Sequence, residues 1–224
     1  MKSISLRVLN VLAKYFYRLK GIMAGRRGVV LVFHEITGKD DASCRISPKA
    51  FKTIIERVEK GNRFVSVNDI LDKRGSNRIS VTFDDVPHSF LDNAYPILKE
   101  KGIPFTLFVC KKFVGMDGFL SEREIKELEK DPLCTVGAHS SNHTKLRDEL
   151  DSNKEIVESK EYLEELLGHP VTLFAYPYGR YDSVSKKNRN EVKEVGFKAA
   201  FSTISSPLPN YYDIYFIPRI ELIR

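Results

Sequence analysis

The sequence has few cysteines, and their positions do not suit cross-linking. Three occur among the 224 residues, Cys44, Cys110 and Cys134, and no two of them form a C-x-x-C pair. An odd number of widely spaced cysteines argues against a disulfide framework. We therefore expect a protein of a reducing compartment, the cytoplasm in the simplest case.

Long apolar runs are also absent. No uninterrupted run reaches the roughly 18 residues of a membrane-spanning helix, and no apolar core followed by small residues indicates a signal peptide. The sequence has no Gly-rich phosphate loop, no internal repeat and no Pro/Gly/Ser-rich linker. These absences favour a single domain without a transmembrane segment.

Much of the formal net charge of +6 arises at the start of the chain. The basic residues that precede the first acidic one are Lys2, Arg7, Lys14, Arg18, Lys20, Arg26 and Arg27. Apolar residues recur between them every three to four positions, which predicts a basic amphipathic helix over residues 1–27. Such a helix either lies on an anionic membrane surface or packs on the domain, and both interpretations stay open. We expect no nucleic acid partner, because no groove motif of aromatic and basic residues accompanies the charge.

From Gly28 onward, short apolar runs alternate with helical patterns, as in an α/β protein. The expected strands are Val29–Phe33, Phe64–Ser66, Ile79–Phe83, Phe105–Val109, Cys134–Gly137, Val171–Ala175, Ala199–Ser202 and Tyr215–Ile217. The expected helices are Pro48–Glu59, Leu91–Lys101, Ser121–Lys130, Asn153–Leu167 and Lys186–Glu194. The pattern predicts one domain over residues 28–224, either a barrel or an open doubly wound sheet.

The expected strand Ile79–Phe83 ends in two adjacent carboxylates, Asp84 and Asp85. Successive residues of a strand point to opposite sides, so one carboxylate could hold a metal while the other reaches a bound water. For an isolated Asp pair, the commoner role is to cap the following turn.

A second strand end favours metal binding over turn capping as the role of the Asp pair. The strand Cys134–Gly137 leads into His139, and His143 follows with three residues between. On a turn or a first helical turn, side chains four apart face the same way, so both imidazoles could bind one ion. One carboxylate and two imidazoles suit zinc or another divalent transition metal with an open coordination position.

These segments resemble the motifs of one family, the polysaccharide deacetylases, also called the NodB-homology or carbohydrate esterase family 4 domain. Thr82-Phe83-Asp84-Asp85 resembles the first motif, and His139-Ser140-Ser141-Asn142-His143 resembles the second. Phe174-Ala175-Tyr176-Pro177-Tyr178-Gly179 resembles the third, and Gly118-Phe119-Leu120-Ser121 is similar to a stretch often found between the first two. The resemblance runs from about Val29 to Ile220 and implies a distorted (β/α) barrel with about seven strands.

The resemblance also implies an activity, the metal-dependent removal of acetyl groups from an N-acetylated polysaccharide or lipid-linked glycan. Asp85, His139 and His143 would hold the divalent metal, with zinc as the first choice and cobalt or nickel as alternatives. Asp84 would be the general base, and the backbone N–H of Tyr178 would bind the oxyanion. Residues that would contact the sugar are Tyr176, Pro177 and Tyr181, since aromatic faces suit pyranose rings.

One departure from the family pattern concerns the general acid that protonates the leaving amine. Most members carry a Leu-x-His motif near the C-terminus, whereas this sequence has no histidine after His169. His34 ends the first expected strand, and in a barrel the first and last strands are neighbours. The Phe33-His34 pair resembles the permuted members that act on poly-N-acetylglucosamine, so we predict that His34 is the acid. A histidine packed at a strand end is the alternative.

Two further departures affect the base and its loop. Val86 stands where the family has glycine, which could narrow the loop beside the metal, and Ala175 stands where many members have an arginine that holds the base. Arg219 is a candidate replacement partner for Asp84, although a surface arginine is an equally good interpretation.

Two other functions stay open on the sequence alone. The same attack by water would serve an amidase that acts on a small non-sugar amide. Val86 and Ala175 are also compatible with an inactive module that binds metal or glycan.

Overall fold

The computed structural model describes residues 28–38, 45–72 and 77–221. Its main sheet is parallel and has the order β10-β1-β5-β6-β7-β8-β9, with β4 paired to the start of β5. The strands of this sheet are β1 (Val29–Phe33), β4 (Arg63–Phe64), β5 (Arg78–Asp84), β6 (Phe105–Val109), β7 (Cys134–Ala138), β8 (Leu173–Ala175), β9 (Ala199–Phe201) and β10 (Ile220–Glu221). A separate pair consists of β2 (Glu35–Ile36) and β3 (Arg45–Ile46).

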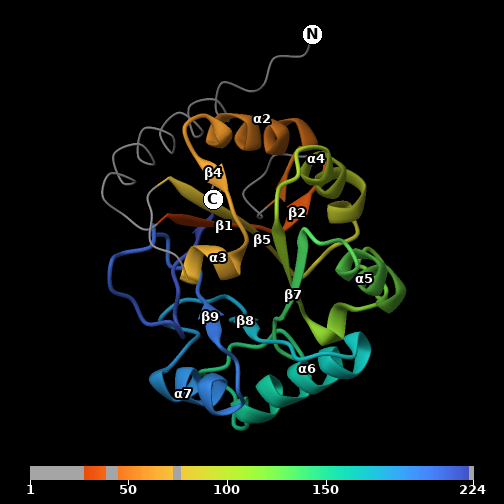
Figure 1. Cartoon of the computed structure of the whole chain (residues 1–224). Coiled ribbons are helices and arrows are strands. Elements are labelled where there is room, and N and C mark those ends of the chain that lie inside the picture. The colour runs from red at the N-terminus through yellow and green to blue at the C-terminus, as the bar shows by residue number, and fades with distance from the viewer. Residues whose placement is uncertain (1–27, 39–44, 73–76, 222–224) are drawn as a thin grey trace.

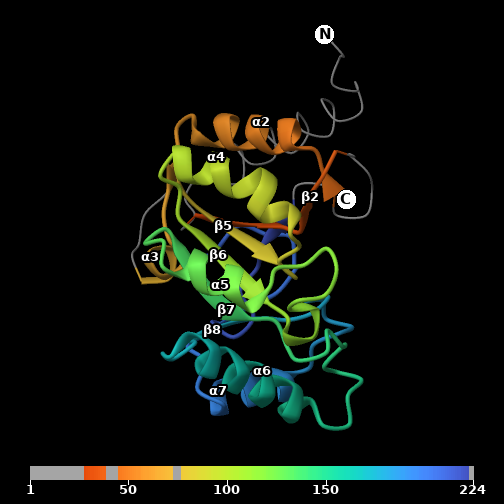
Figure 2. The same ribbon diagram turned by 90° about the vertical axis from the view of Figure 1, so that its right-hand side faces the viewer.

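Helices surround the curled sheet (Figure 1). The helical segments are α2 (Pro48–Glu59), α3 (Val67–Asp72), the π-helical turn η1 (Phe90–Ala94), α4 (Tyr95–Glu100), the 3-10 turn η2 (Lys111–Phe113), α5 (Glu122–Glu129), α6 (Ser152–Leu167) and α7 (Lys186–Glu194). In Figure 2 the arrowheads of β5 and β6 point toward the side on which long loops gather. The fold is a distorted (β/α) barrel of about seven strands, which confirms the fold that the resemblance implied.

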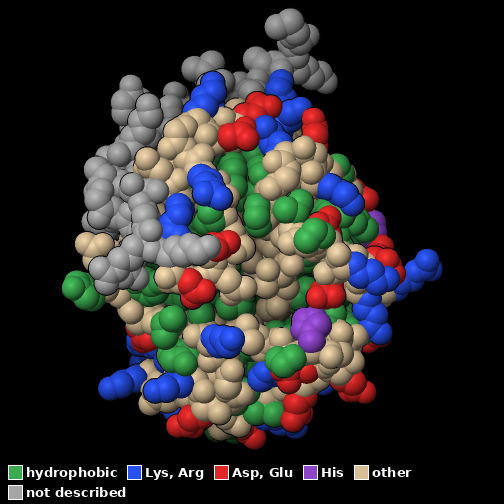
Figure 3. All heavy atoms as spheres, in the orientation of Figure 1, with side chains coloured by type: hydrophobic (Ala, Val, Ile, Leu, Met, Phe, Trp, Pro, Cys, Tyr) green, Lys and Arg blue, Asp and Glu red, His purple; other side chains and the backbone are tan. Residues whose placement is uncertain are grey.

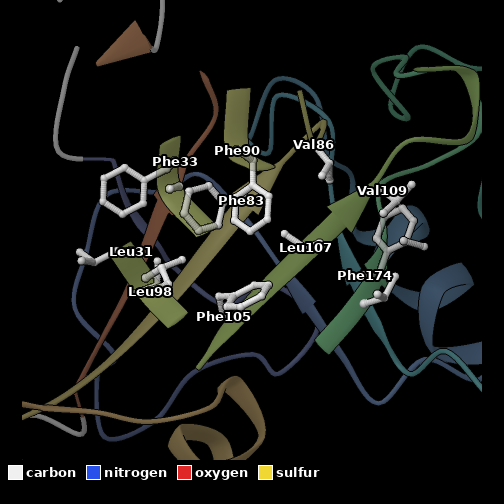
Figure 4. Close-up of a cluster of buried hydrophobic side chains, with 14 of the residues drawn as sticks. Leu31, Phe33, Phe83, Val86, Phe90, Leu98, Phe105, Leu107, Val109 and Phe174 are labelled. Atoms are coloured by element: carbon white, nitrogen blue, oxygen red, sulfur yellow. The ribbon is translucent and has the colours of Figure 1, made fainter. Parts of the chain in front are cut away.

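Side chains of the strands alternate between two apolar layers. On β5, Ile79, Val81 and Phe83 face the helices, in the layer drawn in Figure 4. The intervening residues of β5, Ser80, Thr82 and Asp84, therefore face the interior of the barrel.

The interior holds a second, smaller apolar cluster. It includes Phe108 of β6 and Phe201 of β9, together with Val67 and Ile70 of α3. Because the Arg78 side chain at the start of β5 donates to a carbonyl of α3, this short helix closes the end of the barrel where the strands begin. The candidate site lies at the opposite end of the barrel, where the strands finish.

The sheet closes through an interrupted last segment. Ile217 forms a parallel bridge with Phe201 of β9, and Ile220–Glu221 pairs with β1. Pro218 lies between these pairings, and because proline has no N–H the ladder breaks there. The predicted strand Tyr215–Ile217 is therefore wrong, since of its residues only Ile217 pairs and the strand proper is β10.

Local signals account for most helix boundaries. Ser47 caps α2 by accepting from the Ala50 N–H, and Ser121 forms a capping box with Glu124 at the start of α5. The single helix predicted over Leu91–Lys101 is divided between η1 and α4. The Tyr95 N–H donates to the Phe90 carbonyl five residues back, and Pro96 next to it has no N–H to continue the regular pattern.

No helix within the described ranges is long and apolar enough to cross a membrane. Residues 1–27, where the sequence predicts a basic amphipathic helix, lie outside those ranges. On the face seen in Figure 3, basic and acidic side chains are interspersed. The basic excess of the sequence therefore does not form a field of one sign over that face.

Candidate metal centre and active site

The predicted site residues follow strands that run side by side. His34 follows β1, Asp84 ends β5, and His139 follows β7. Phe33 pairs with Phe83, so His34 and Asp84 come directly after partners in the sheet. The carboxyl ends of parallel strands in a barrel lie at one face, where such enzymes carry their chemistry.

Three side chains converge there as potential metal ligands. One ligand atom from each of Asp85, His139 and His143 lies within 4.8 Å of the other two. The Oδ1 atom of Asp85 is 3.2 Å from Nε2 of His143 and 3.6 Å from Nε2 of His139. The structure thus brings together the three residues that the sequence singled out as ligands.

His139 is held in the form that a metal ion requires. Its Nδ1 lies 2.8 Å from the carbonyl oxygen of Ala175, which can only accept, so Nδ1 carries the proton and the lone pair of Nε2 is directed toward Asp85. Burial lowers the pKa of this imidazole to about 3. The ring is therefore neutral near pH 7 and fixed in one tautomer, as a coordinating histidine must be.

The electrostatics of Asp85 and His143 also fit a cation. Burial raises the pKa of Asp85 to about 6, although the charges of His34 and Arg219 oppose it. Burial lowers the pKa of His143, and the Lys112 charge acts in the same direction. Asp85 Oδ1 is buried without a hydrogen-bond partner among the described residues. Burying a carboxylate oxygen without a partner costs free energy. A divalent metal ion would supply that partner, so the residues present fit such an ion.

Asp84 is paired with Arg219 in the barrel interior. Arg219 donates to Oδ1 at 2.7 Å and to Oδ2 at 2.6 Å, and both side chains are fully buried. Burial alone would raise the pKa of Asp84, but the guanidinium outweighs it and holds the pKa at about 2. The predicted pairing is confirmed and the surface interpretation of Arg219 is wrong, while a part for Arg219 in catalysis stays a prediction.

Two γ-turns place residues of the first and third motifs. The Val86 N–H donates to the Asp84 carbonyl around Asp85, whose φ is +62°, and the Gly179 N–H donates to the Pro177 carbonyl around Tyr178, whose φ is +60°. Positive φ is unfavourable for residues other than glycine, and such strain concentrates at functional sites. In the second motif, Ser140 and His143 also have positive φ.

Val86 takes the conformation that glycine adopts most easily, with a φ of +54°. Its side chain is 2% exposed and packs in the outer apolar layer, where Figure 4 shows it. The expectation that Val86 narrows the loop beside the metal is therefore wrong, because the side chain points into the core.

The third motif presents one tyrosine and buries another. Tyr178 is 50% exposed, and its backbone N–H has no acceptor among the described residues, as an oxyanion donor requires. Tyr176 is 0% exposed, and its hydroxyl donates to the Tyr215 carbonyl. The expectation that Tyr176 lines the sugar site is therefore wrong. Pro177 is buried as well and offers no surface to a sugar, whereas Tyr181 is 62% exposed.

His34 has a neighbour that the sequence reasoning missed. Its Nδ1 lies 3.8 Å from Oε1 of Glu221, which pairs with Val32 through β10. Because Phe33 pairs with Phe83, His34 leaves its strand beside the strand end that carries Asp84 and Asp85. No local signal marks Glu221, because its position depends on the pairing of the last strand with the first.

A parallel barrel that gathers three candidate metal ligands and a buried carboxylate where its strands end is suited to hydrolysis by an activated water molecule. Residues 72–200 match the family profile described as polysaccharide deacetylase. The match spans more than half of the chain, and the chain belongs to the polysaccharide deacetylase family. It is accordingly a hydrolase of that type.

Individual relatives agree with this assignment. The chain is 28% identical over 206 residues to the poly-beta-1,6-N-acetyl-D-glucosamine N-deacetylase of Staphylococcus aureus (strain MSSA476), covering 82% of this chain and 70% of the relative. The structure of IcaB from Ammonifex degensii superposes with a TM-score of 0.77 at 26% identity, over 88% of this chain and 92% of that one. The Streptococcus pyogenes deacetylase PplD, at 22% identity over 86% and 91% of the chains, shares the fold with a TM-score of 0.77.

Proposed function

We propose that this protein is a metal-dependent de-N-acetylase that hydrolyses acetamido groups of an N-acetylated polysaccharide or lipid-linked glycan and releases acetate. The observation that carries the proposal is the position of the buried Asp84–Arg219 pair directly beside the ligand set that begins at Asp85. The name of the Staphylococcus aureus relative supports β-1,6-linked N-acetylglucosamine oligomers as the first substrates to test.

The ligand set and the base divide the first step between them. Asp85, His139 and His143 would hold the metal, with zinc as the first choice and cobalt or nickel as alternatives. When bound, a divalent ion lowers the pKa of water and polarises a carbonyl. Asp84, kept ionised by Arg219, would take the proton from the attacking water.

The remaining residues serve the tetrahedral intermediate and the leaving group. The backbone N–H of Tyr178 would donate to the developing oxyanion. His34 would give a proton to the leaving amine, and Glu221 would orient its ring. The exposed ring of Tyr181 would contact the sugar.

The direct test measures acetate and free amine from N-acetylglucosamine oligomers. Metal-free protein should release neither, and activity should return with zinc, cobalt or nickel. Release from no oligomer with any of these ions would contradict the glycan substrate. Faster turnover of cyclic imides or small N-acyl compounds would instead make the protein an amidase of small amides.

Peripheral contact with an anionic membrane is a second part of the proposal. The basic and apolar pattern of residues 1–27 supports it. In liposome sedimentation, the full chain should bind vesicles that contain anionic lipid, and a chain that starts at Gly28 should bind them much less. Equal binding of the two chains would contradict the proposed membrane contact of residues 1–27.

A further inference from the structure

Two aromatic rings lie next to the proposed metal ligand His143. The centroid of the His143 ring is 5.4 Å from that of Phe113 and 5.1 Å from that of Tyr178. We call Phe113, His143 and Tyr178 the aromatic rim. Since half of Tyr178 is exposed, the rim offers a surface on which a pyranose ring can lie.

Two lysines adjoin the aromatic rim, Lys145 through its side chain and Lys112 through its place in the chain. Lys145 places Nζ 5.7 Å from the centre of the Tyr178 ring. Lys112 precedes Phe113, and its backbone N–H donates at 2.8 Å to the Ser141 carbonyl, within the His139–His143 segment. Both lysines are exposed. The Lys145 ammonium group therefore lies over one ring of the rim, and Lys112 directly precedes another in the chain.

Neither lysine is neutralised within the part of the chain that the structure describes. The adjacent Lys111 pairs with Glu158 at 3.8 Å, but no such contact joins Lys112 or Lys145 to a carboxylate there. The exposed acids of the neighbouring loops include Asp117, Asp148, Asp151 and Asp182, and none of them forms an ion pair with either lysine. The two positive charges are available to a ligand.

We propose that the substrate carries a negative charge, a phosphate or a carboxylate, within about one sugar residue of the acetamido group that is cleaved. The inference rests on the proposed de-N-acetylase function and narrows its substrate. An acetamido group is neutral and gives no reason for two cations beside the rim, whereas an anionic group would meet both. Charge complementarity of this kind contributes to the choice of partner and to the rate of association.

The test compares three tetramers with the metal-loaded full chain. One is a neutral N-acetylglucosamine tetramer, the second has a phosphate ester on one residue, and the third alternates N-acetylglucosamine with glucuronate. We expect kcat/KM for at least one charged tetramer to exceed that for the neutral one by about tenfold at low salt, and the advantage to shrink as salt screens it. The charged tetramer that is preferred identifies the source of the charge.

The double variant Lys112→Gln/Lys145→Gln tests the two residues. We expect it to reduce the ratio of kcat/KM for the charged over the neutral tetramer by about fivefold, since each exposed charge contributes modestly. Lys60→Gln is the matched control, because Lys60 is exposed at the end of α2, near the start of the strands, and should leave the ratio unchanged.

Two other outcomes distinguish a failure of this inference from a failure of the de-N-acetylase proposal. If the neutral tetramer is cleaved as well as both charged ones, or if the double variant keeps the full ratio, the inference is overturned and the de-N-acetylase proposal stands. If no tetramer releases acetate with any metal, the de-N-acetylase proposal fails and the inference falls with it.

Discussion

Arg219 holds Asp84 by two parallel hydrogen bonds, one to each carboxylate oxygen, in a position that leaves neither side chain exposed. The same guanidinium also donates to the Thr82 hydroxyl and to the Ser202 carbonyl, so it joins β5 to the segment after β9. One arginine therefore connects the proposed base to the closing edge of the barrel.

Replacing Arg219 should affect both stability and the pH dependence of activity. Arg219→Gln leaves a buried carboxylate without its cation, which costs about 3–5 kcal/mol in comparable cases. The largest influence that opposes burial is then lost, so the pKa of Asp84 rises from about 2 and the acid limb of the pH–rate profile should move to higher pH. Urea unfolding and the profile measure the two effects. Arg219→Lys, which keeps the charge without the bidentate geometry, should lose less stability, and unchanged stability in both variants would contradict the argument.

The two adjacent aspartates should separate in their effects. Asp84→Asn removes the proposed base, so turnover should fall by about 10²–10⁴ while metal binding persists. Asp85→Asn removes a proposed ligand, so metal affinity should fall by about 100-fold or more. Calorimetric metal titration beside acetate release distinguishes them. Equal loss of metal affinity in both variants would refute the assignment of separate roles.

Metal affinity should depend on pH through Asp85. Burial raises the pKa of this carboxyl to about 6, so below that pH a proton must leave before a metal can bind. The affinity should therefore fall by about tenfold per pH unit below pH 6 and level off above it. His139, with a pKa of about 3, stays neutral over this range, whereas protonation of His143, whose pKa burial lowers, would steepen the fall at lower pH. A competition dye followed from pH 4.5 to 7.5 would reveal the slope, and a flat curve down to pH 5 would contradict it.

The role of His34 depends on the leaving group, which gives a selective test. His34→Gln should reduce hydrolysis of an acetamido sugar by about 10²–10⁴, because the amine leaves only with a proton. Hydrolysis of 4-nitrophenyl acetate, whose leaving group needs no proton, should change little.

Glu221→Gln provides a graded comparison with His34→Gln. If Glu221 orients the His34 ring, this variant should reduce amide hydrolysis less than His34→Gln does and should likewise leave the aryl ester nearly unaffected. Equal losses on both substrates in either variant would point to a general disturbance of the site and not to a missing proton donor.

Local chemistry explains which elements could be predicted from the sequence. β1, β6, α2 and α7 have the predicted bounds, and the two helices begin at serines, Ser47 and Ser185, that cap them. The convergence of Asp85, His139 and His143 was also predictable, because strand ends in a parallel sheet meet at one face whatever the number of strands.

The features that could not be predicted from the sequence depend on contacts between distant segments. The sequence left Arg219 as either a buried partner or a surface residue, and the choice is decided by hydrogen bonds to Asp84, 135 positions away. Tyr176 was misassigned because an aromatic residue in a motif looks the same whether it faces a sugar or the core. Its hydroxyl has a partner in the last loop, at Tyr215, which no local pattern indicates.

The interrupted segment after β9 has a consequence for the order in which activity arises. Arg219 and Glu221 both belong to it, and they reach the proposed base and the proposed acid only once Ile217 has met β9 and Ile220 has met β1. Under the proposed function, the base and the acid therefore lack both partners until this segment has paired at each end. Hydrolysis would then begin only after the last strand is in place, whereas Asp85, His139 and His143 lie outside that segment.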